Sequence, residues 1–297
     1  MATTTSILTR IVNVIWISAI SLTLAADADD KRTSTFAPDF LKTIVSMEQL
    51  ESPTNAHSIG TGFVVGSPNG HILLITANHI LEGVKASNGG SLAKLAWRLN
   101  ETNGPSDLVY DQFVTQFLGG GWFMSSNADV ACRFITYGNE SDVRGLPVSM
   151  FLPQKQLEPG APVLILGFPM GIRSEKYAKP IVRHGIVALS EHSELMLDAF
   201  VFPGNSGGPV FYAPSIMVSG TLQSPLVNED KIIGMVTDYV PYTDVGISPQ
   251  THRPRITFEE NSGLSHAVPA DRIIELINRP DVVVEDMRLP KPPEAKK

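Results

Sequence analysis

Three side chains that could cooperate in nucleophilic catalysis occur in the order His79, Asp129 and Ser206. Ser206 lies in "FPGNSGGPVF" (202–211), where glycines and prolines surround one hydroxyl group. A serine hydroxyl is a weak nucleophile unless a general base contacts it and a third group orients that base. His79 follows the apolar run of "LITANHILEG", and Asp129 stands at the head of the run in "ADVACRFI". We therefore predict that Ser206 is the nucleophile, His79 the base and Asp129 the group that orients the base.

Short strands are the elements that must position these side chains. Apolar runs rich in Val, Ile, Phe and Thr, separated by Gly, Pro, Asn or Ser, follow one another from "KTIVSMEQL" to "GLSHAVP". This pattern is typical of β-strands. The clearest helical spacing is in "PADRIIELINRP" (269–280), between two prolines. We therefore predict an all-β architecture with a C-terminal helix, in a length that two small barrels could fill.

The quoted segments together resemble a known family. "TANHI", "ADVA" and "PGNSGGPV", with "GTGFVV" upstream and "IIGMVTDYV" and "GLSHAVPADRI" downstream, are similar to chymotrypsin-fold, trypsin-like serine proteases of the HtrA/Deg-like branch. The resemblance runs from about 58 to 278. It implies two perpendicular six-stranded antiparallel β-barrels. It also implies a serine endopeptidase that cleaves peptide bonds through an acyl-enzyme.

Domain boundaries follow from composition and from this resemblance. The loop-like stretch "YGNESDVRGLPVS" (137–149) is the expected crossing between the barrels. We predict a signal peptide at 1–28, a flexible lead-in at 29–39, an N-terminal barrel at 40–145, a C-terminal barrel with the terminal helix at 146–280, and a disordered tail at 281–297. In this interpretation no PDZ domain follows the protease domain, because too little chain remains for one.

The resemblance also assigns residues around the nucleophile. The backbone around Gly204, Asn205 and Ser206 would form the oxyanion hole, where a side chain at position 204 would obstruct the turn. Asn205 stands where digestive proteases of this fold carry an aspartate, so activation by pairing with a new N-terminus is not expected.

The substrate pocket is assigned in the same way. Phe200, Thr237 and His266 are the expected substrate-binding residues. Phe200 occupies the place of the acidic residue that selects basic side chains in trypsin-like pockets. We therefore expect an apolar residue before the scissile bond, and unfolded or envelope proteins as substrates.

Two alternatives remain open at this point. A catalytically silent binding module of the same fold is one, since loop geometry decides whether a triad is active. The other is an α/β-hydrolase esterase, because "GNSGG" also matches G-x-S-x-G, with His252 or His266 as the later histidine. That fold needs a helix after the serine, which Pro209 opposes. It also needs alternating strands and long helices, which are missing.

Charge and the N-terminal segment restrict partners and location. The net charge is −7 and no basic block occurs, which argues against nucleic acid as a partner.

Arg10 precedes the uncharged run "IVNVIWISAISLTLAA", which is shorter than the roughly 20 residues needed to span a bilayer. We expect a secretory signal, cleaved after Ala28 or Ala25, and export to a bacterial periplasm or the exterior. An uncleaved membrane anchor is the alternative.

The remaining candidate groups are predicted to be structural. Cys132 is the only cysteine and lies in an apolar run, which favours a buried small hydrophobe over a nucleophile. We expect no metal site and no cofactor, since neither H-E-x-x-H nor paired cysteines occur. Five further histidines without a visible partner are expected in surface or loop positions: His57, His71, His184, His192 and His252. The long connection after Ser206, 211–234, could be a regulatory loop or a plain hairpin.

Overall fold

The computed structural model describes residues 38–290 apart from short gaps at 53–54, 103, 137–140, 174–175, 214–215, 219–220 and 224–230. The predicted signal peptide, the first part of the lead-in and the end of the predicted tail lie outside the described residues. Strands dominate the described part, which confirms the predicted all-β class. Among the helices described, none is both long enough and apolar enough to cross a bilayer.

The first half of the described chain forms one antiparallel sheet, to which one short parallel strand is added. Its strands run in the order β5-β4-β1-β2-β3-β7-β6, and β8 pairs with β2. The resemblance implies a six-stranded barrel here, and the structure has instead one sheet of eight strands, of which β6 and β8 are only two residues long. The bounds are β1 (Ile44–Ser52), β2 (Asn55–Gly66), β3 (Ile72–Thr76), β4 (Leu95–Leu99), β5 (Asp107–Tyr110), β6 (Phe123–Met124), β7 (Ala131–Ile135) and β8 (Leu146–Pro147).

The second half forms a closed six-stranded antiparallel barrel, as the resemblance implies. The strand order is β10-β11-β16-β15-β12-β9. Strand β11 alternates buried Leu195 and Leu197 with exposed Glu194 and Asp198, the pattern of a strand with one face on a core. The bounds are β9 (Pro162–Gly167), β10 (Ile181–Glu191), β11 (Glu194–Asp198), β12 (Pro209–Tyr212), β15 (Lys231–Ile247) and β16 (Pro254–Pro269).

The connection after Ser206 contains a small separate piece of sheet. Strands β13 (Ile216–Val218) and β14 (Thr221–Gln223) pair with each other. Nearly half of the residues predicted to form a regulatory loop or plain hairpin at 211–234 lie in the gaps at 214–215, 219–220 and 224–230, outside the described residues. That pair of alternatives stays open.

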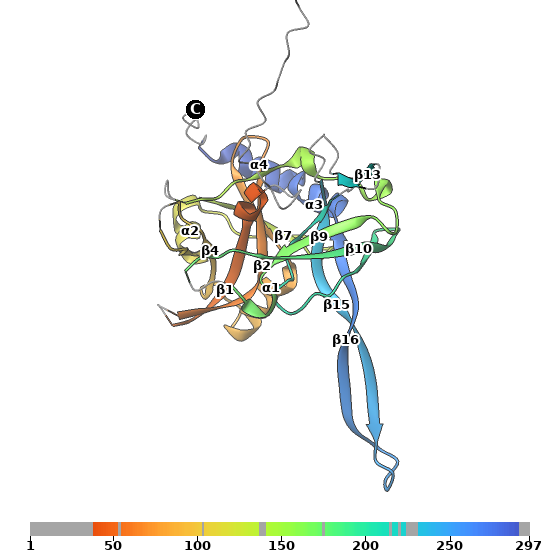
Figure 1. Cartoon of the computed structure of the whole chain (residues 1–297). Helices are drawn as coiled ribbons and strands as arrows, with labels where there is room; N and C mark the ends of the chain where they lie inside the picture. Colours follow the sequence, from red (N-terminus) through yellow and green to blue (C-terminus); the bar gives the residue numbers. More distant parts are fainter. Residues whose placement is uncertain are drawn as a thin grey trace, which may run out of the picture. The chain divides into compact units, whose positions relative to one another are not determined.

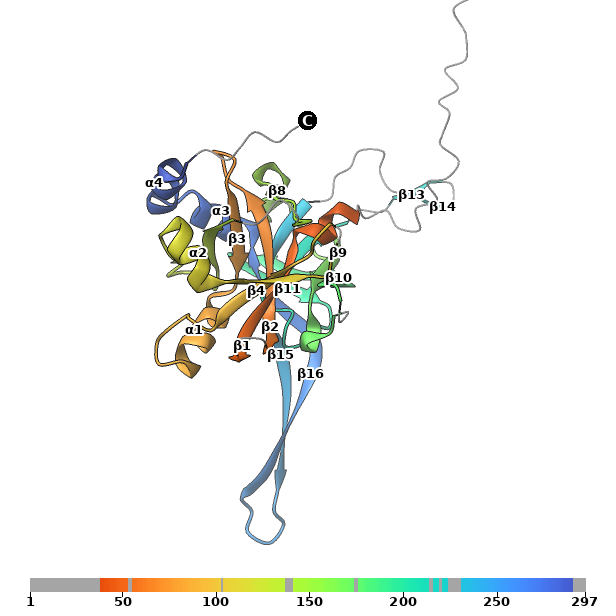
Figure 2. The same cartoon turned by 90° about the vertical axis from the view of Figure 1, so that its left-hand side faces the viewer.

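Strands β15 and β16 continue far beyond the barrel as a two-stranded ribbon (Figures 1 and 2). Pairing extends from Gly234 opposite Pro269 to Ile247 opposite Pro254. Only the barrel ends of the two strands have other partners among the described strands, β12 beside Lys231–Met235 and β11 beside Leu264–Ala267. The sequence pattern indicates strands at the barrel ends of β15 and β16 but does not indicate the ribbon.

Four α-helices complete the described structure. Helices α1 (Asn78–Ser87) and α2 (Asp111–Leu118) belong to the first half, and α3 (Ala270–Ile277) is the predicted C-terminal helix. Its buried Ile273 and Ile277 join a core cluster that also contains Val130 of the first half. Helix α3 therefore packs against the sheet that the first half of the chain forms.

Helix α4 (Pro280–Arg288) corrects the predicted disordered tail at 281–297. Proline at the first helical position and Asp281 in the first turn favour a helix start. The buried carboxylate of Asp286 then anchors the helix, because Ser67 Oγ donates to it at 2.7 Å and His71 Nδ1 lies 2.7 Å from it. His71 is thus a partnered, largely buried side chain, and of its expected surface or loop position only the loop is found, directly before β3.

Candidate active site

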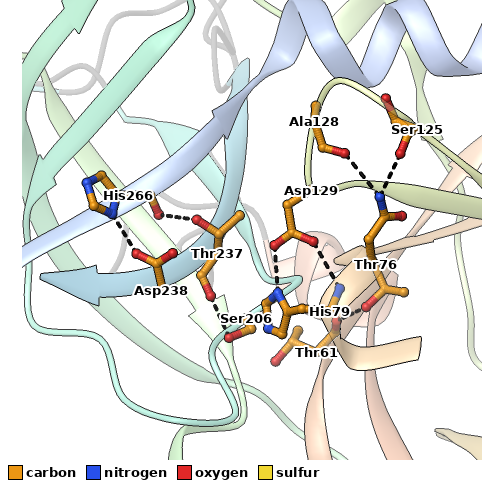
Figure 3. A network of polar contacts seen from close by, with 11 residues as sticks. Thr61, Thr76, His79, Ser125, Ala128, Asp129, Ser206, Thr237, Asp238 and His266 are labelled. Carbon is orange, nitrogen blue, oxygen red and sulfur yellow. Dashed lines mark hydrogen bonds and ion pairs between the residues drawn. The ribbon is translucent and has the colours of Figure 1, made fainter. Parts of the chain in front are cut away.

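His79 and Asp129 come together because the strands that precede and follow them are neighbours. His79 lies in the first turn of α1, directly after β3, and Asp129 precedes β7. The pairing of Thr76 with Ala131 places the end of β3 beside the start of β7. His79 Nδ1 donates to Asp129 Oδ2 at 2.6 Å, and the backbone N–H of His79 donates to Oδ1 at 3.0 Å (Figure 3). Because a carboxylate only accepts, the proton is on Nδ1 and the neutral ring keeps its lone pair on Nε2.

The pKa of His79 lies above its ordinary value of 6.5. The hydrogen bond to Asp129 is the largest cause. Burial acts in the opposite direction, but the negative charges of Asp129, Asp238 and Glu82 add to the effect of the hydrogen bond. The charged imidazolium that forms when His79 accepts a proton is therefore stabilised in place.

The pKa of Asp129 lies below its ordinary value of 3.8. Burial by itself raises this pKa. The ring and charge of His79, together with the backbone N–H groups of Asn78 and His79, outweigh the burial. Asp129 is consequently a carboxylate at neutral pH, as a group that orients and stabilises an imidazolium must be.

Ser206 lies in the turn before β12, and its hydroxyl is directed at the main chain of β15. Ser206 Oγ donates to the carbonyl oxygen of Thr237 at 2.6 Å (Figure 3). Among the described contacts this bond, and not one to His79, occupies the hydroxyl proton. The structure thus brings His79 and Asp129 into direct contact, while the hydroxyl proton of Ser206 is directed at Thr237 and not at a base.

The backbone around Gly204 leaves two N–H groups available for an oxyanion. Met170 N–H donates to the carbonyl oxygen of Pro203 at 2.6 Å, so the N–H of the following Gly204 points the opposite way across a planar trans peptide. In the described part of the chain, neither this N–H nor that of Ser206 has an acceptor. The N–H of Asn205 differs, because it donates to Phe202 at 2.9 Å. Two of the three predicted oxyanion-hole residues therefore offer a donor.

Glycine is required at 204 for two reasons. Its φ is +99°, a conformation that side chains rarely adopt, and a Cβ there would lie 2.3 Å from the carbonyl oxygen of Phe168. Asn205 supports the same turn from within, since its buried Oδ1 accepts from Phe202 N–H at 3.0 Å. This turn is therefore determined by its residue types.

Thr61 of β2 joins the first sheet to the turn that carries the candidate nucleophile, Ser206 (the nucleophile turn), and the sequence did not reveal this role. Its N–H donates to Ser206 O at 2.8 Å and its hydroxyl donates to Gly204 O at 2.6 Å. The same hydroxyl accepts from Phe168 N–H at 3.1 Å. The available signal was a buried-strand threonine between two glycines in "GTGFVV".

Asn78 is a second positioning residue that the sequence did not reveal. Its Nδ2 donates to Ser125 O at 2.9 Å and to Ala128 O at 3.1 Å. These bonds fasten the start of α1 to the loop that carries Asp129. The only available signal was its place next to the candidate base.

The three predicted substrate-binding residues lie around the point where the ribbon leaves the barrel. Thr237 Oγ1 donates to His266 O at 3.3 Å, and His266 Nδ1 lies 2.6 Å from Asp238 (Figure 3). Phe200 is half exposed, and a Cβ on Gly263 would touch its ring at 3.4 Å. Phe200 thus lies beside Gly263 of β16, and His266 of the same strand is bonded to Thr237 through its backbone carbonyl. The partner of His266, Asp238, was not predicted.

Two other interpretations are settled by the structure. Cys132 is fully buried, and burial raises the pKa of its thiol to about 12, which confirms a structural role. The α/β-hydrolase alternative is wrong, because strand β12 and not a helix follows Ser206. Within the described residues, no three His, Cys, Asp or Glu side chains are grouped to hold a metal ion.

Comparison with known proteins identifies related sequences and structures. The family model described as a trypsin-like peptidase domain matches residues 60–214. A solved structure described as a thermostable serine protease, AL20, from an extremophilic microorganism is similar with a TM-score of 0.49 and 13% sequence identity. That likeness covers 81% of this chain and 97% of the other. No curated protein matches the sequence significantly.

Proposed function

The chain belongs to the family of trypsin-like peptidase domains and is a serine endopeptidase, and on that premise we propose that Ser206, His79 and Asp129 are its catalytic triad. The observation that carries the proposal is the paired bond from His79 to Asp129, with the side chain at 2.6 Å and the backbone at 3.0 Å. These bonds raise the pKa of His79 and leave its Nε2 free to accept a proton, as a general base requires.

Acylation begins when Ser206 Oγ attacks the carbonyl carbon of the scissile peptide bond. His79 Nε2 accepts the hydroxyl proton, and the N–H groups of Gly204 and Ser206 stabilise the negative oxygen that develops. His79 then donates this proton to the leaving amine, which leaves an ester on Ser206. Water, deprotonated by the same imidazole, hydrolyses the ester and restores the hydroxyl.

The carbonyl of Thr237 holds the serine proton before substrate arrives. A backbone N–H of the substrate that donates to this carbonyl would compete for it and release the hydroxyl toward His79. Substrate binding and alignment of the nucleophile would then be one event, which raises the effective concentration of the reacting groups.

The substrate class is proposed to be unfolded polypeptide with an apolar residue before the scissile bond. Phe200 supports this, since an exposed aromatic ring and no carboxylate stands at its position. Membership of the HtrA/Deg-like branch, export through the N-terminal segment and action on envelope proteins remain parts of the proposal. They rest on the sequence patterns alone.

Activity-based labelling tests the nucleophile and the competence of the site together. A serine-directed fluorophosphonate should label the mature chain at Ser206, and the chain should cleave unfolded casein. Ser206→Ala should abolish both, which excludes a contaminating protease. Absence of labelling and of cleavage in the unsubstituted chain would instead indicate a catalytically silent binding module.

A peptide library tests the pocket separately. Cleavage after apolar residues is the expected result, at rates well above those after lysine or arginine. Predominant cleavage after basic residues would contradict the interpretation of Phe200 and leave the triad assignment intact.

A further inference from the structure

The ribbon of β15 and β16 has free strand edges outside the barrel. From Pro241 opposite Asn261 to Ile247 opposite Pro254, the two strands pair only with each other among the described strands (Figures 1 and 2). A two-stranded hairpin is marginally stable in water by itself. Its free edges also present unpaired N–H and C=O groups that another chain can bind. A ribbon of this length therefore suits the binding of a further strand.

One of these free edges begins at the nucleophile. Along the barrel, β12 covers this edge of β15, and the last bonds join Val236 to Gly207 and Gly208 at 2.8 and 2.9 Å. The next carbonyl, that of Thr237, accepts from Ser206 Oγ. A register shift between Val236 and Tyr239 separates this carbonyl from the regular pairing with β16. Beyond it no described strand covers the edge as far as Ile247.

Three exposed apolar side chains share one face of the ribbon, the apolar face, with two carboxylates, Asp244 and Glu260. In an antiparallel pair, residues directly opposite one another lie on the same face, and every second pair shares that face. The register places Tyr242, Phe258 and Ile256 on one face, through the pairs Tyr242–Glu260, Asp244–Phe258 and Gly246–Ile256. All three side chains are more than half exposed, at 60%, 53% and 53%. Exposed apolar groups gathered in this way indicate an interaction site.

Gly246 extends this apolar face to the edge of β15. A Cβ at this position would lie 2.8 Å from Ile256 Cγ2 and 3.7 Å from Phe258 Cε2. The two side chains of β16 therefore cover the place that a side chain of β15 would fill. A third strand beside β15 would meet them there directly.

We propose that the outer edge of β15, Tyr239–Ile247, binds the substrate polypeptide as a third, antiparallel strand, with its apolar side chains on the face of Tyr242, Ile256 and Phe258. The inference rests on the proposed function, because the edge is identified by its continuity with Ser206. Antiparallel pairing agrees with the other strand pairs of this barrel and is the more stable form. It places the residues upstream of the scissile bond along the ribbon.

This arrangement selects long, extended polypeptides. At about 3.4 Å per residue, a substrate needs about ten residues upstream of the cleaved bond to reach the end of the ribbon. Folded proteins cannot offer such a segment, and short peptides end before they reach the apolar face. Alternating apolar residues in the upstream segment are the preferred class.

Peptides of two lengths test the proposal on the full mature chain. Both share four residues before and four after the scissile bond, and the long peptide adds about ten upstream residues of alternating valine and lysine. We expect kcat/KM for the long peptide to be about tenfold higher, the combined effect of a few cross-strand contacts. The double variant Ile256→Ser/Phe258→Ser should remove this gain and leave the short peptide unchanged. Val245→Ser, on the opposite face, is the matched control and should keep most of it.

N-methylated peptides separate strand pairing from simple hydrophobic contact. Alternate amides of a bound strand face β15, so methylating one alternate set of upstream amides should abolish the gain, and methylating the other set should not. Equal rates for long and short peptides, or equal effects of both methylated sets, would overturn the proposal.

Hydrogen exchange keeps this test independent of catalysis. In Ser206→Ala, the long peptide should slow exchange of the amides of 239–247, and the short peptide should not. If protection is absent, the edge does not bind substrate, whatever the activity of the unsubstituted chain. If protection depends on protein concentration without any peptide, the ribbon binds a second copy of the chain and the proposal is wrong.

Discussion

The hydroxyl group of Ser206 donates its hydrogen bond to the backbone carbonyl of Thr237, with 2.6 Å between the two oxygen atoms (Figure 3). The candidate base, His79, is meanwhile held by Asp129. The resting site therefore has its base oriented and its nucleophile paired with the main chain.

The acid limb of activity should lie above pH 6.5. Only neutral His79 can accept the serine proton, and its pKa is raised above 6.5, first by the hydrogen bond to Asp129 and then by neighbouring carboxylates. Activity should thus increase as pH rises through this raised pKa and fall below it. The measurement is kcat/KM against pH with a peptide that carries no titrating group. A limb centred clearly below 6.5 would contradict the assignment of His79 as the base.

Replacement of Asp129 by asparagine should lower kcat by about 10⁴, because the amide cannot hold the imidazole in the useful tautomer or stabilise its charge. The residual acid limb should move to lower pH, since the main cause of the raised His79 pKa is removed. Measurement of kcat and kcat/KM over a range of pH tests both effects. Asn127→Ala in the same loop is the control and should leave kcat and the limb nearly unchanged.

An alanine at position 204 should lower kcat by about 10²–10³, the usual effect of losing one oxyanion donor. The added Cβ would lie 2.3 Å from the Phe168 carbonyl, so the turn must shift. Gly160→Ala is a matched control, because its φ of +89° is similar but nothing lies within 4 Å of the added carbon. If both variants lose the same activity, backbone strain and not the position of the Gly204 N–H explains the loss.

Thr61→Val should lower kcat with little change in KM. Valine keeps the shape but removes the hydroxyl that donates to Gly204 O and accepts from Phe168 N–H. The buried carbonyl of Gly204 would then lack its donor, and the nucleophile turn would lose a fixed orientation. Thr61→Ser retains the hydroxyl and should restore most of kcat. Equal loss in both variants would show that the methyl group matters and not the hydrogen bonds.

Asp286→Ala should lower the free energy of unfolding by about 3 kcal/mol, since it removes one partner of a buried, hydrogen-bonded pair with His71. Helix α4 would lose its main polar anchor, while the site around Ser206 is not in contact with it. Denaturant titration measures the loss, and kcat on a short peptide should persist well below the transition. Asp39→Ala removes an exposed ion pair with Arg144 and should leave the unfolding midpoint unchanged.

The sequence predicted the candidate site best at positions where the conformation or the chemistry requires one particular residue type. The glycine at 204 and the order of His79, Asp129 and Ser206 pointed to chemistry because a strained turn and a base are needed at fixed places. The sheet topology that joins His79 to Asp129 was accessible only through the family resemblance. Alternation of apolar residues identifies strands but does not say which strands are neighbours.

Other features depended on contacts that no pattern encodes. Thr61 and Asn78 act through backbone carbonyls from distant segments, and His71 found its partner, Asp286, near the other end of the described chain. The ribbon was missed because its exposed strands mix charged and apolar residues, and a strand with no core face lacks the usual alternation. The segment "RITFEE" (255–260) contains β-branched and aromatic residues that weakly indicate a strand.

The hydrophobic core of the first sheet is complete only after α3 and α4 have docked on it. Ile273, Val282 and Leu289 belong to the same buried cluster as Leu73 and Phe134. During synthesis the strands of this sheet leave the ribosome long before the helices that complete their core. Contacts between such distant residues form slowly. A newly made chain therefore stays below its full stability, with apolar strands accessible, until α4 has been synthesised and has docked.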